Sequence, residues 1–178
     1  MVWLDLLDEE EEMKEIFRQT PNVSRGRTIT PTGIVLHHTA GSYAGSVSWC
    51  LNPASQVSYH CIVDLNGDRT FLAKETQRAW HSGRSNFKGV SDCNSFMLGI
   101  AVSGNTYNRE LTPEEINSVA CLCVNYMHKW DFQIENITTH REVSPGRKAD
   151  ISPEAEKQIM EAVLEIIWKW KHLYYLPC

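Results

Sequence analysis

The segment 140–150 carries three side chains that can act together in chemistry. It holds an imidazole at His140, an ammonium at Lys148 and a carboxylate at Asp150, in a stretch rich in Pro and Gly. Another imidazole, His37, ends the apolar run 34–36. Two His and one carboxylate leave the fourth position of a tetrahedral ion open, which is the ligand count of a catalytic zinc, whereas structural zinc sites close all four positions. The sequence therefore predicts a zinc hydrolase in which His37, His140 and Asp150 hold one Zn²⁺.

Two further side chains bear on this site. His37 and His38 are adjacent, so on a strand they point to opposite faces and only one of them can be a ligand. Periodicity alone leaves open which one it is. Lys148 lies two residues before Asp150 and can stabilise the negative charge of a tetrahedral oxyanion. The alternative interpretation of Lys148 is a solvated loop cation.

Size and composition favour one compact monomeric domain. The chain has 178 residues, 42% of them hydrophobic, which is enough for a core without disulfides. Its net charge is −5 and no basic stripe runs along it, which argues against nucleic-acid binding. No apolar run is long enough to span a membrane, and residues 1–12 are acidic where an export signal is basic and then apolar. The six Cys form no CxxC pair, which is typical of buried thiols.

Strand and helix patterns alternate along the chain and predict an α/β (α+β) fold, a single mixed β-sheet flanked by helices. Strands are expected over 33–37, 57–64, 69–75, 96–102 and 137–140, with a hairpin turn at Asn66-Gly67. Helices are expected over 5–18, 46–51, 113–130 and 153–173. We therefore expect an N-terminal helical extension over 1–30 and a catalytic domain over 31–178, which includes the C-terminal helix. The aromatic and basic stretch 166–175 favours packing on the domain over membrane contact.

Five motifs occur in order along most of the chain. They are Leu36-His37-His38-Thr39-Ala40, Gln56-Val57-Ser58-Tyr59-His60, Arg78-Ala79-Trp80-His81-Ser82-Gly83, Asn94-Ser95-Phe96-Met97-Leu98-Gly99-Ile100 and the segment 140–150. In these motifs, over about residues 31–155, the chain resembles the zinc-dependent N-acetylmuramoyl-L-alanine amidases, the type that includes peptidoglycan recognition proteins and phage lysozyme-amidases. The resemblance implies a zinc at the bottom of a cleft. It also implies hydrolysis of the amide between the muramic lactyl group and L-Ala of peptidoglycan or a muropeptide.

The resemblance also implies roles for individual residues. It favours His37 over His38 as the ligand and gives Lys148 the oxyanion role. Trp80 and His81 become candidates for the substrate cleft, with ordinary packing as the alternative. Thr39 and Asn94 are also expected to line that cleft. His60 is expected to lie in the core or behind the ligands.

One position departs from a branch of this family. Cytoplasmic and many bacterial members have Gly-Ile-Glu after the Asn-Ser motif, and that Glu is their general base. Here the position is Ala101, in Gly99-Ile100-Ala101. The phage lysozyme and recognition-protein branch uses a Tyr instead, and Tyr59 matches it. Tyr59 is therefore the second predicted catalytic residue, although a phenol with a pKa near 10 is a poor base unless its surroundings lower that pKa.

The resemblance favours a phage endolysin, made in the host cytoplasm and released to the wall by a holin. The first alternative is a cytoplasmic amidase that recycles muropeptides, against which Ala101 counts. The second is a peptidoglycan-recognition protein that binds without cutting. Members of that kind typically lose a zinc ligand, and here all three ligand types are present.

Overall fold

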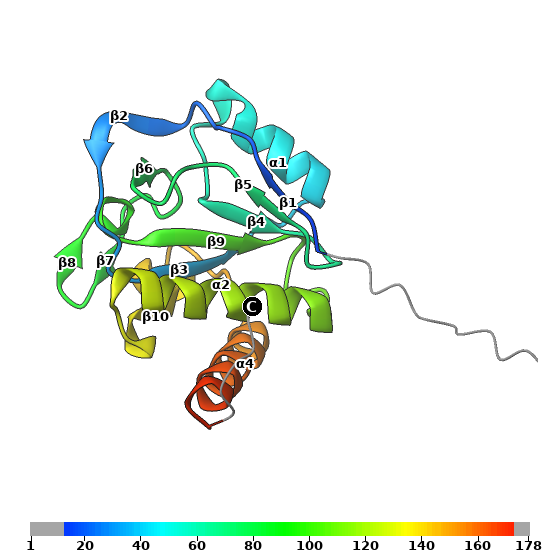
Figure 1. Cartoon of the computed structure of the whole chain (residues 1–178). Coiled ribbons are helices and arrows are strands. Elements are labelled where there is room, and N and C mark those ends of the chain that lie inside the picture. Colours follow the sequence, from blue (N-terminus) through cyan, green and yellow to red (C-terminus); the bar gives the residue numbers. More distant parts are fainter. Residues whose placement is uncertain (1–12, 173–178) are drawn as a thin grey trace, which may run out of the picture.

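A six-stranded mixed sheet runs through the centre of the molecule (Figure 1). The structure is a computed structural model that describes residues 13–172. The strands follow in the order β1 (Glu15–Phe17), β5 (Arg69–Phe71), β4 (Cys61–Val63), β9 (Leu98–Val102), β3 (Ile34–His38) and β10 (Ile137–Thr139). Only β4 and β5 pair antiparallel within this sheet, through the predicted hairpin. Two small antiparallel pairs join β2 (Val23–Thr28) to β6 (Gln77–Ala79) and β7 (Asn86–Phe87) to β8 (Val90–Ser91).

Helices cover both faces of the sheet, which confirms the predicted fold class. In Figure 1, α1 (Tyr43–Leu51) lies over one face, α2 (Pro113–Trp130) lies against the other, and α4 (Pro153–His172) packs beyond α2. The shorter helical segments are η1 (Pro53–Ser55), η2 (Cys93–Ser95), η3 (Ile134–Asn136) and α3 (His140–Val143). As predicted, α2 begins at a capping box, in which Thr112 and Glu115 satisfy each other's backbone N–H groups.

The two central strands place His37 on the face covered by α1. Ile34 and Leu36 belong to the large core cluster that includes α2 and α4. Because side chains alternate along a strand, His37 lies on the opposite face. There its ring lies 5.1 Å from the ring of Tyr59, which packs against the cluster of α1. His38 lies on the other side of β3 and bonds Thr106, so the prediction that only one of the two His joins the ligand cluster is confirmed.

The N-terminal segment differs from its prediction. The helix expected over 5–18 is wrong for its described part, because Glu15–Phe17 forms the edge strand β1, parallel to β5. Its remainder lies outside the described residues. The described part of the expected helical extension, residues 13–30, contains β1 and β2 instead of a helix. Tertiary pairing overrides local helix propensity here, and the buried Arg69 guanidinium bonds Glu15 at 2.6 Å.

The C-terminal helix packs on the domain as predicted. Ile159 and Val163 are fully buried, and Ile166 and Ile167 pack against the same core cluster. No helix among residues 13–172 is both long and apolar enough to cross a membrane. The five Cys residues within this range are buried thiols, as predicted, and Cys178 lies outside the described residues.

Candidate active site

The three predicted ligands meet at one point. Nδ1 of His37 lies 3.1 Å from Nδ1 of His140 and 3.2 Å from Oδ2 of Asp150. The third side of this triangle, from His140 Nδ1 to Asp150 Oδ2, measures 3.1 Å. Both imidazoles are buried, and the Asp150 side chain is 12% exposed. Residues from β3, from the start of α3 and from the loop before α4 therefore bring two nitrogens and one oxygen to a common centre.

In both His37 and His140, Nδ1 faces the ligand triangle, and the contact made by Nε2 fixes which nitrogen carries the proton. Nε2 of His140 lies 3.0 Å from the Ser82 carbonyl oxygen, which can only accept, and 3.4 Å from the Arg147 guanidinium, which can only donate. The closer contact, to the carbonyl, places the proton on Nε2. Nε2 of His37 faces Nδ1 of His81 at 3.1 Å, and Nε2 of His81 lies 3.1 Å from the Met97 carbonyl oxygen. His81 therefore donates from Nε2 and accepts at Nδ1, which makes Nε2 of His37 a donor. Both His37 and His140 then turn an unprotonated Nδ1 toward Asp150.

Three lone-pair atoms at this separation repel one another unless a cation lies between them. Donor atoms around a tetrahedral ion with bonds of about 2.0–2.1 Å are roughly 3.3 Å apart, close to the triangle seen here. Two neutral imidazoles and one carboxylate suit zinc, and each imidazole has its other nitrogen tied to an acceptor, as metal-binding His residues do. The residues present fit the predicted zinc ion, with one coordination position left for water or substrate.

Burial and neighbouring groups keep these ligands in their metal-binding forms. Burial lowers the pKa of His37 to about 4, although the Asp150 carboxylate opposes the shift. At neutral pH the His37 ring is therefore uncharged. Burial alone would raise the pKa of Asp150, but hydrogen bonds and charge from His140 and His37, in forms that carry a proton on Nδ1, outweigh it and hold that pKa well below its ordinary range. A bound cation would take the place of these protons. Asp150 is therefore an anion across the physiological range.

Local structure holds the two ligands of the C-terminal half in place. The sequence predicted that His140 ends a strand, but in the structure it is the first residue of α3. Thr139 caps that helix by accepting from the Glu142 backbone N–H. The backbone around Asp150 is bonded on several sides. Its carbonyl accepts from the Arg141 N–H at 2.7 Å, and the preceding carbonyl, of Ala149, accepts from the Tyr107 hydroxyl at 2.9 Å.

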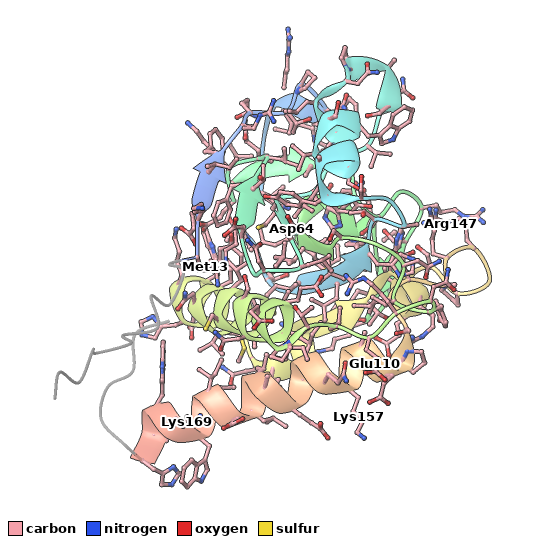
Figure 2. The ribbon with its side chains drawn as sticks, turned by 90° about the vertical axis from the view of Figure 1, so that its right-hand side faces the viewer. Met13, Asp64, Glu110, Arg147, Lys157 and Lys169 are labelled. Atoms are coloured by element: carbon pink, nitrogen blue, oxygen red, sulfur yellow. The ribbon has the colours of Figure 1, made fainter. Side chains whose placement is uncertain are left out.

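A cleft of about 600 Å³ opens above the ligand cluster. Its walls come from α1, the loop after β3, the segments 56–59 and 80–83, and the loop 147–150. Lys148 lies on this loop with an exposed side chain, and its charge contributes to the lowered pKa of His37. Figure 2 shows the neighbouring Arg147 at the edge of the molecule, on the side away from Met13. Lys148 is thus placed where an ammonium can approach a substrate bound over the ligands.

Comparison with known proteins identifies the family. The family model for N-acetylmuramoyl-L-alanine amidases matches residues 26–153, which is most of the chain. The chain belongs to the N-acetylmuramoyl-L-alanine amidase family. The 1,6-anhydro-N-acetylmuramyl-L-alanine amidase AmpD of Salmonella typhimurium is 31% identical over 98 residues, 55% of this chain and 52% of that protein. The chain thus spans about half the length of the curated relatives it matches.

Solved structures share the fold. An AmpD crystal structure aligns with a TM-score of 0.70 at 22% identity, covering 89% of this chain and 98% of that one. A mutant endolysin from Bacillus subtilis aligns with a TM-score of 0.68 at 19% identity, covering 85% and 99% of the two chains. At these identities the likeness speaks for the fold alone. It agrees with the mixed sheet and flanking helices described above.

Ala101, the position at which the sequence analysis expected a Glu in one branch of the family, is a core residue in this structure. Ala101 lies opposite His37 in the β3–β9 pairing and packs fully buried against Ile62 and Leu72. Among the described residues that line the cleft, Asp150 is the only carboxylate. Tyr59 lies in the cleft wall, but burial raises the pKa of its phenol. The geometry therefore gives Tyr59 the properties of a hydrogen-bond donor and not those of a base.

The four predicted substrate-binding residues all line the cleft, but some of their polar atoms already form hydrogen bonds within the protein. The indole Nε1 of Trp80 donates to Ser24 at 3.0 Å, which leaves its ring on the cleft wall. Oδ1 of Asn94 accepts from the backbone N–H groups of His81 and Ser82, so its amide Nδ2 is the end left for a ligand. Thr39 bonds within its own turn to Gly41. Substrate contact by these residues stays a prediction.

His81 has a different main contact from the one predicted. Its ring is 5% exposed and lies behind His37, and its two nitrogens face His37 and the Met97 carbonyl. The sequence prediction missed this, and it also missed the Ser82 carbonyl that orients His140. A backbone acceptor has no signature in sequence. The lone Gly99 within a strand was a usable signal, because such a glycine often marks a close approach of another group.

His60 gives this region a pH-dependent stability. Its Nδ1 accepts from the Gly99 N–H and its Nε2 donates to the Gln77 carbonyl, so the buried ring is held neutral. Burial lowers the pKa of His60 to about 4. In the unfolded chain this pKa is near 6.5, so the unfolded state binds more protons between these values, and stability falls as pH falls through that window.

We expect His60 to make the folded state more sensitive to acid. Between pH 7 and pH 5 the free energy of unfolding should fall by about 2 kcal/mol more in the wild type than in His60→Asn, whose Oδ1 keeps the acceptor for Gly99. Urea unfolding of both proteins at the two pH values measures this difference. Parallel pH dependences would show that His60 does not contribute.

Proposed function

We propose that this chain is a zinc-dependent N-acetylmuramoyl-L-alanine amidase, which hydrolyses the amide between the muramic lactyl group and L-Ala. The observation that carries the proposal is the triangle of two imidazole nitrogens and one carboxylate oxygen, 3.1–3.2 Å apart, at the bottom of a cleft. The Ser82 carbonyl for His140, and the Met97 carbonyl acting through His81 for His37, fix the tautomers in which Nδ1 turns its lone pair toward the centre of the triangle. Family membership over residues 26–153 supports the choice of amide.

Each cleft residue has a part in this reaction that its chemistry can fulfil. A bound zinc would polarise the scissile carbonyl and acidify a water molecule. The Lys148 ammonium would stabilise the oxyanion that forms when the carbonyl is attacked. The Tyr59 phenol, kept protonated by burial, would donate a hydrogen bond at the same centre. The Trp80 ring and the Asn94 amide Nδ2 would orient the sugar–peptide junction.

A soluble muropeptide is the better supported substrate class. The curated relatives include AmpD proteins of several bacteria, named as 1,6-anhydro-N-acetylmuramyl-L-alanine amidases, at 27–34% identity. The endolysin role expected from the sequence has weaker support, because the endolysins of known structure that align with this chain share only the fold, at 19% identity. The comparisons therefore favour a recycling-type activity, which the sequence analysis held as its alternative, despite Ala101.

Product analysis with two substrates tests the proposal. Purified protein is incubated with an anhydromuramoyl tripeptide and, separately, with intact peptidoglycan, and the products are identified by mass spectrometry. We expect stem peptides with a free L-Ala amino terminus, released faster from the soluble substrate and lost on chelation. Faster release from intact wall would instead favour the endolysin role. Binding to either substrate without any release would overturn the enzyme proposal and leave a recognition protein.

A further inference from the structure

His37 has a neighbour that decides where its proton lies. In a free imidazole the proton exchanges between Nδ1 and Nε2, and only the ring with an unprotonated Nδ1 can bind an ion at the ligand triangle. Asp150 Oδ2, 3.2 Å from Nδ1, is an anionic acceptor that favours a proton on that nitrogen. Without an opposing contact, the ring would donate to Asp150 and close the site against a cation.

His81 supplies the opposing contact. Its Nδ1 lies 3.1 Å from Nε2 of His37, and its own proton is held on Nε2 by the Met97 carbonyl at 3.1 Å. The acceptor at Nδ1 draws the His37 proton to Nε2. The Ser82 hydroxyl, 2.9 Å from the same Nδ1, is a second donor to it. Because a hydroxyl can rotate to another acceptor, it leaves the His81 Nδ1 open to the His37 proton.

The fold leaves room for the His81 ring at this place. A Cβ added at Gly99 would lie 2.5 Å from Cγ and 2.8 Å from Nδ1 of His81, closer than real Cβ contacts. Asn94 holds the backbone by accepting from the His81 and Ser82 N–H groups at 3.1 and 2.8 Å. The ring is therefore held by its backbone, by the Met97 carbonyl and by the surface of Gly99, and all three direct Nδ1 toward His37.

We propose that His81 is a positioning residue, which holds His37 in its metal-binding tautomer by accepting the Nε2 proton. This inference rests on the proposed metal centre and adds to it a residue that acts through a ligand and not on the ion itself. It assigns His81 to the support of the ligands, in place of the substrate contact predicted from sequence. Partners of this kind typically change metal affinity by about 10–100-fold when they are removed.

Two substitutions separate the acceptor from the shape of the ring. His81→Phe keeps a planar ring but offers His37 no acceptor. His81→Asn keeps an acceptor, because its Oδ1 can take the place of Nδ1. We expect zinc affinity to fall by about 10–100-fold in His81→Phe and to recover most of that loss in His81→Asn. His128→Phe is the control, since it replaces an exposed imidazole on α2 whose ring contacts Trp170 and no ligand, and its zinc affinity should equal that of the wild type.

The measurement is competition for Zn²⁺ between each purified protein and a chromophoric chelator, with no substrate present. The visible spectrum of the Co²⁺-loaded proteins reports whether the His37 ligand is retained. If His81→Phe does not fold, His81→Gln replaces it, since its amide reaches the position of Nε2 but not that of Nδ1. Circular dichroism establishes which variants are folded.

Each result has a defined meaning. Weak zinc binding by His81→Phe with recovery in His81→Asn, and a matching change and recovery of the Co²⁺ spectrum, would establish the tautomer role. Unchanged affinity in His81→Phe would overturn this inference while leaving the metal centre intact. Equal loss in both His81 variants would also overturn it, because the ring shape would then be what matters. A wild-type protein that binds no zinc would overturn the metal centre and this inference together.

Discussion

Replacing His140 by Ala is expected to weaken zinc binding by on the order of 100-fold and to abolish amide hydrolysis while leaving the fold intact. The variant loses one of three ligand atoms. If the roughly 10–16 kcal/mol of a four-ligand zinc site is shared among its ligands, one ligand is worth about 3 kcal/mol, or on the order of 100-fold in affinity. The remaining His37 and Asp150 can then share a proton as an ordinary hydrogen-bonded pair. The apoprotein should therefore lose little stability.

Metal content, product release and thermal unfolding measure this outcome together. His128→Ala is the control, because His128 is exposed on α2 and its ring contacts only Trp170 among the described aromatic rings. The control should bind one zinc and gain a higher Tm when zinc is added, since an ion that binds only the folded state stabilises it. The His140 variant should gain less in Tm than the control at the same zinc concentration. Wild-type zinc affinity and activity in His140→Ala would contradict the assignment of this ligand.

Replacing Lys148 by Met is expected to separate catalysis from metal binding. The exposed Lys148 side chain lies on the cleft loop, and the structure gives it no part in the ligand triangle. Removing one donor to a developing oxyanion typically lowers kcat by about 10²–10³-fold. KM should change less, because the charge develops in the transition state. Steady-state kinetics on a muropeptide, together with zinc content, measure both effects.

Lys157→Met is the matched control for this prediction. Figure 2 shows Lys157 pointing outward from α4, and its side chain is exposed. The control should keep the kcat and zinc content of the wild type. A Lys148 variant with wild-type kcat would make Lys148 a solvated loop cation, the alternative considered from the sequence. A variant that lost zinc would show that the loop, and not the charge, had been disturbed.

The residues of the ligand cluster could be predicted from the sequence because two His and one carboxylate are themselves the signal of a metal site. Residue chemistry indicated His140 and Asp150, and the family resemblance chose His37 over His38. The central strands β3 and β9 were predictable for a similar reason, since a continuous apolar run indicates a strand buried on both faces. The capping box at Thr112 located the start of α2 directly.

Other features depend on contacts between distant residues, which the sequence does not display. The segment around Glu15 has the charges of a solvated helix, yet it forms an edge strand because β5 offers a partner and Arg69 an ion pair. His81 lines the cleft as predicted, but the sequence did not show that its ring nitrogens face His37 and the Met97 carbonyl. The shifted pKa of Tyr59 follows from burial, which could only be known once α1 was placed.

Zinc titration of the metal-free protein tests the central claim most directly. Chelator-stripped protein receives Zn²⁺ in substoichiometric steps, and cleavage of a muramoyl peptide is followed by mass spectrometry of the released peptide. We predict no cleavage in the stripped protein, then a linear rise in rate to a plateau at one zinc per chain. The product should carry a free L-Ala amino terminus. Full cleavage without zinc, or no cleavage at any zinc concentration, would contradict the account.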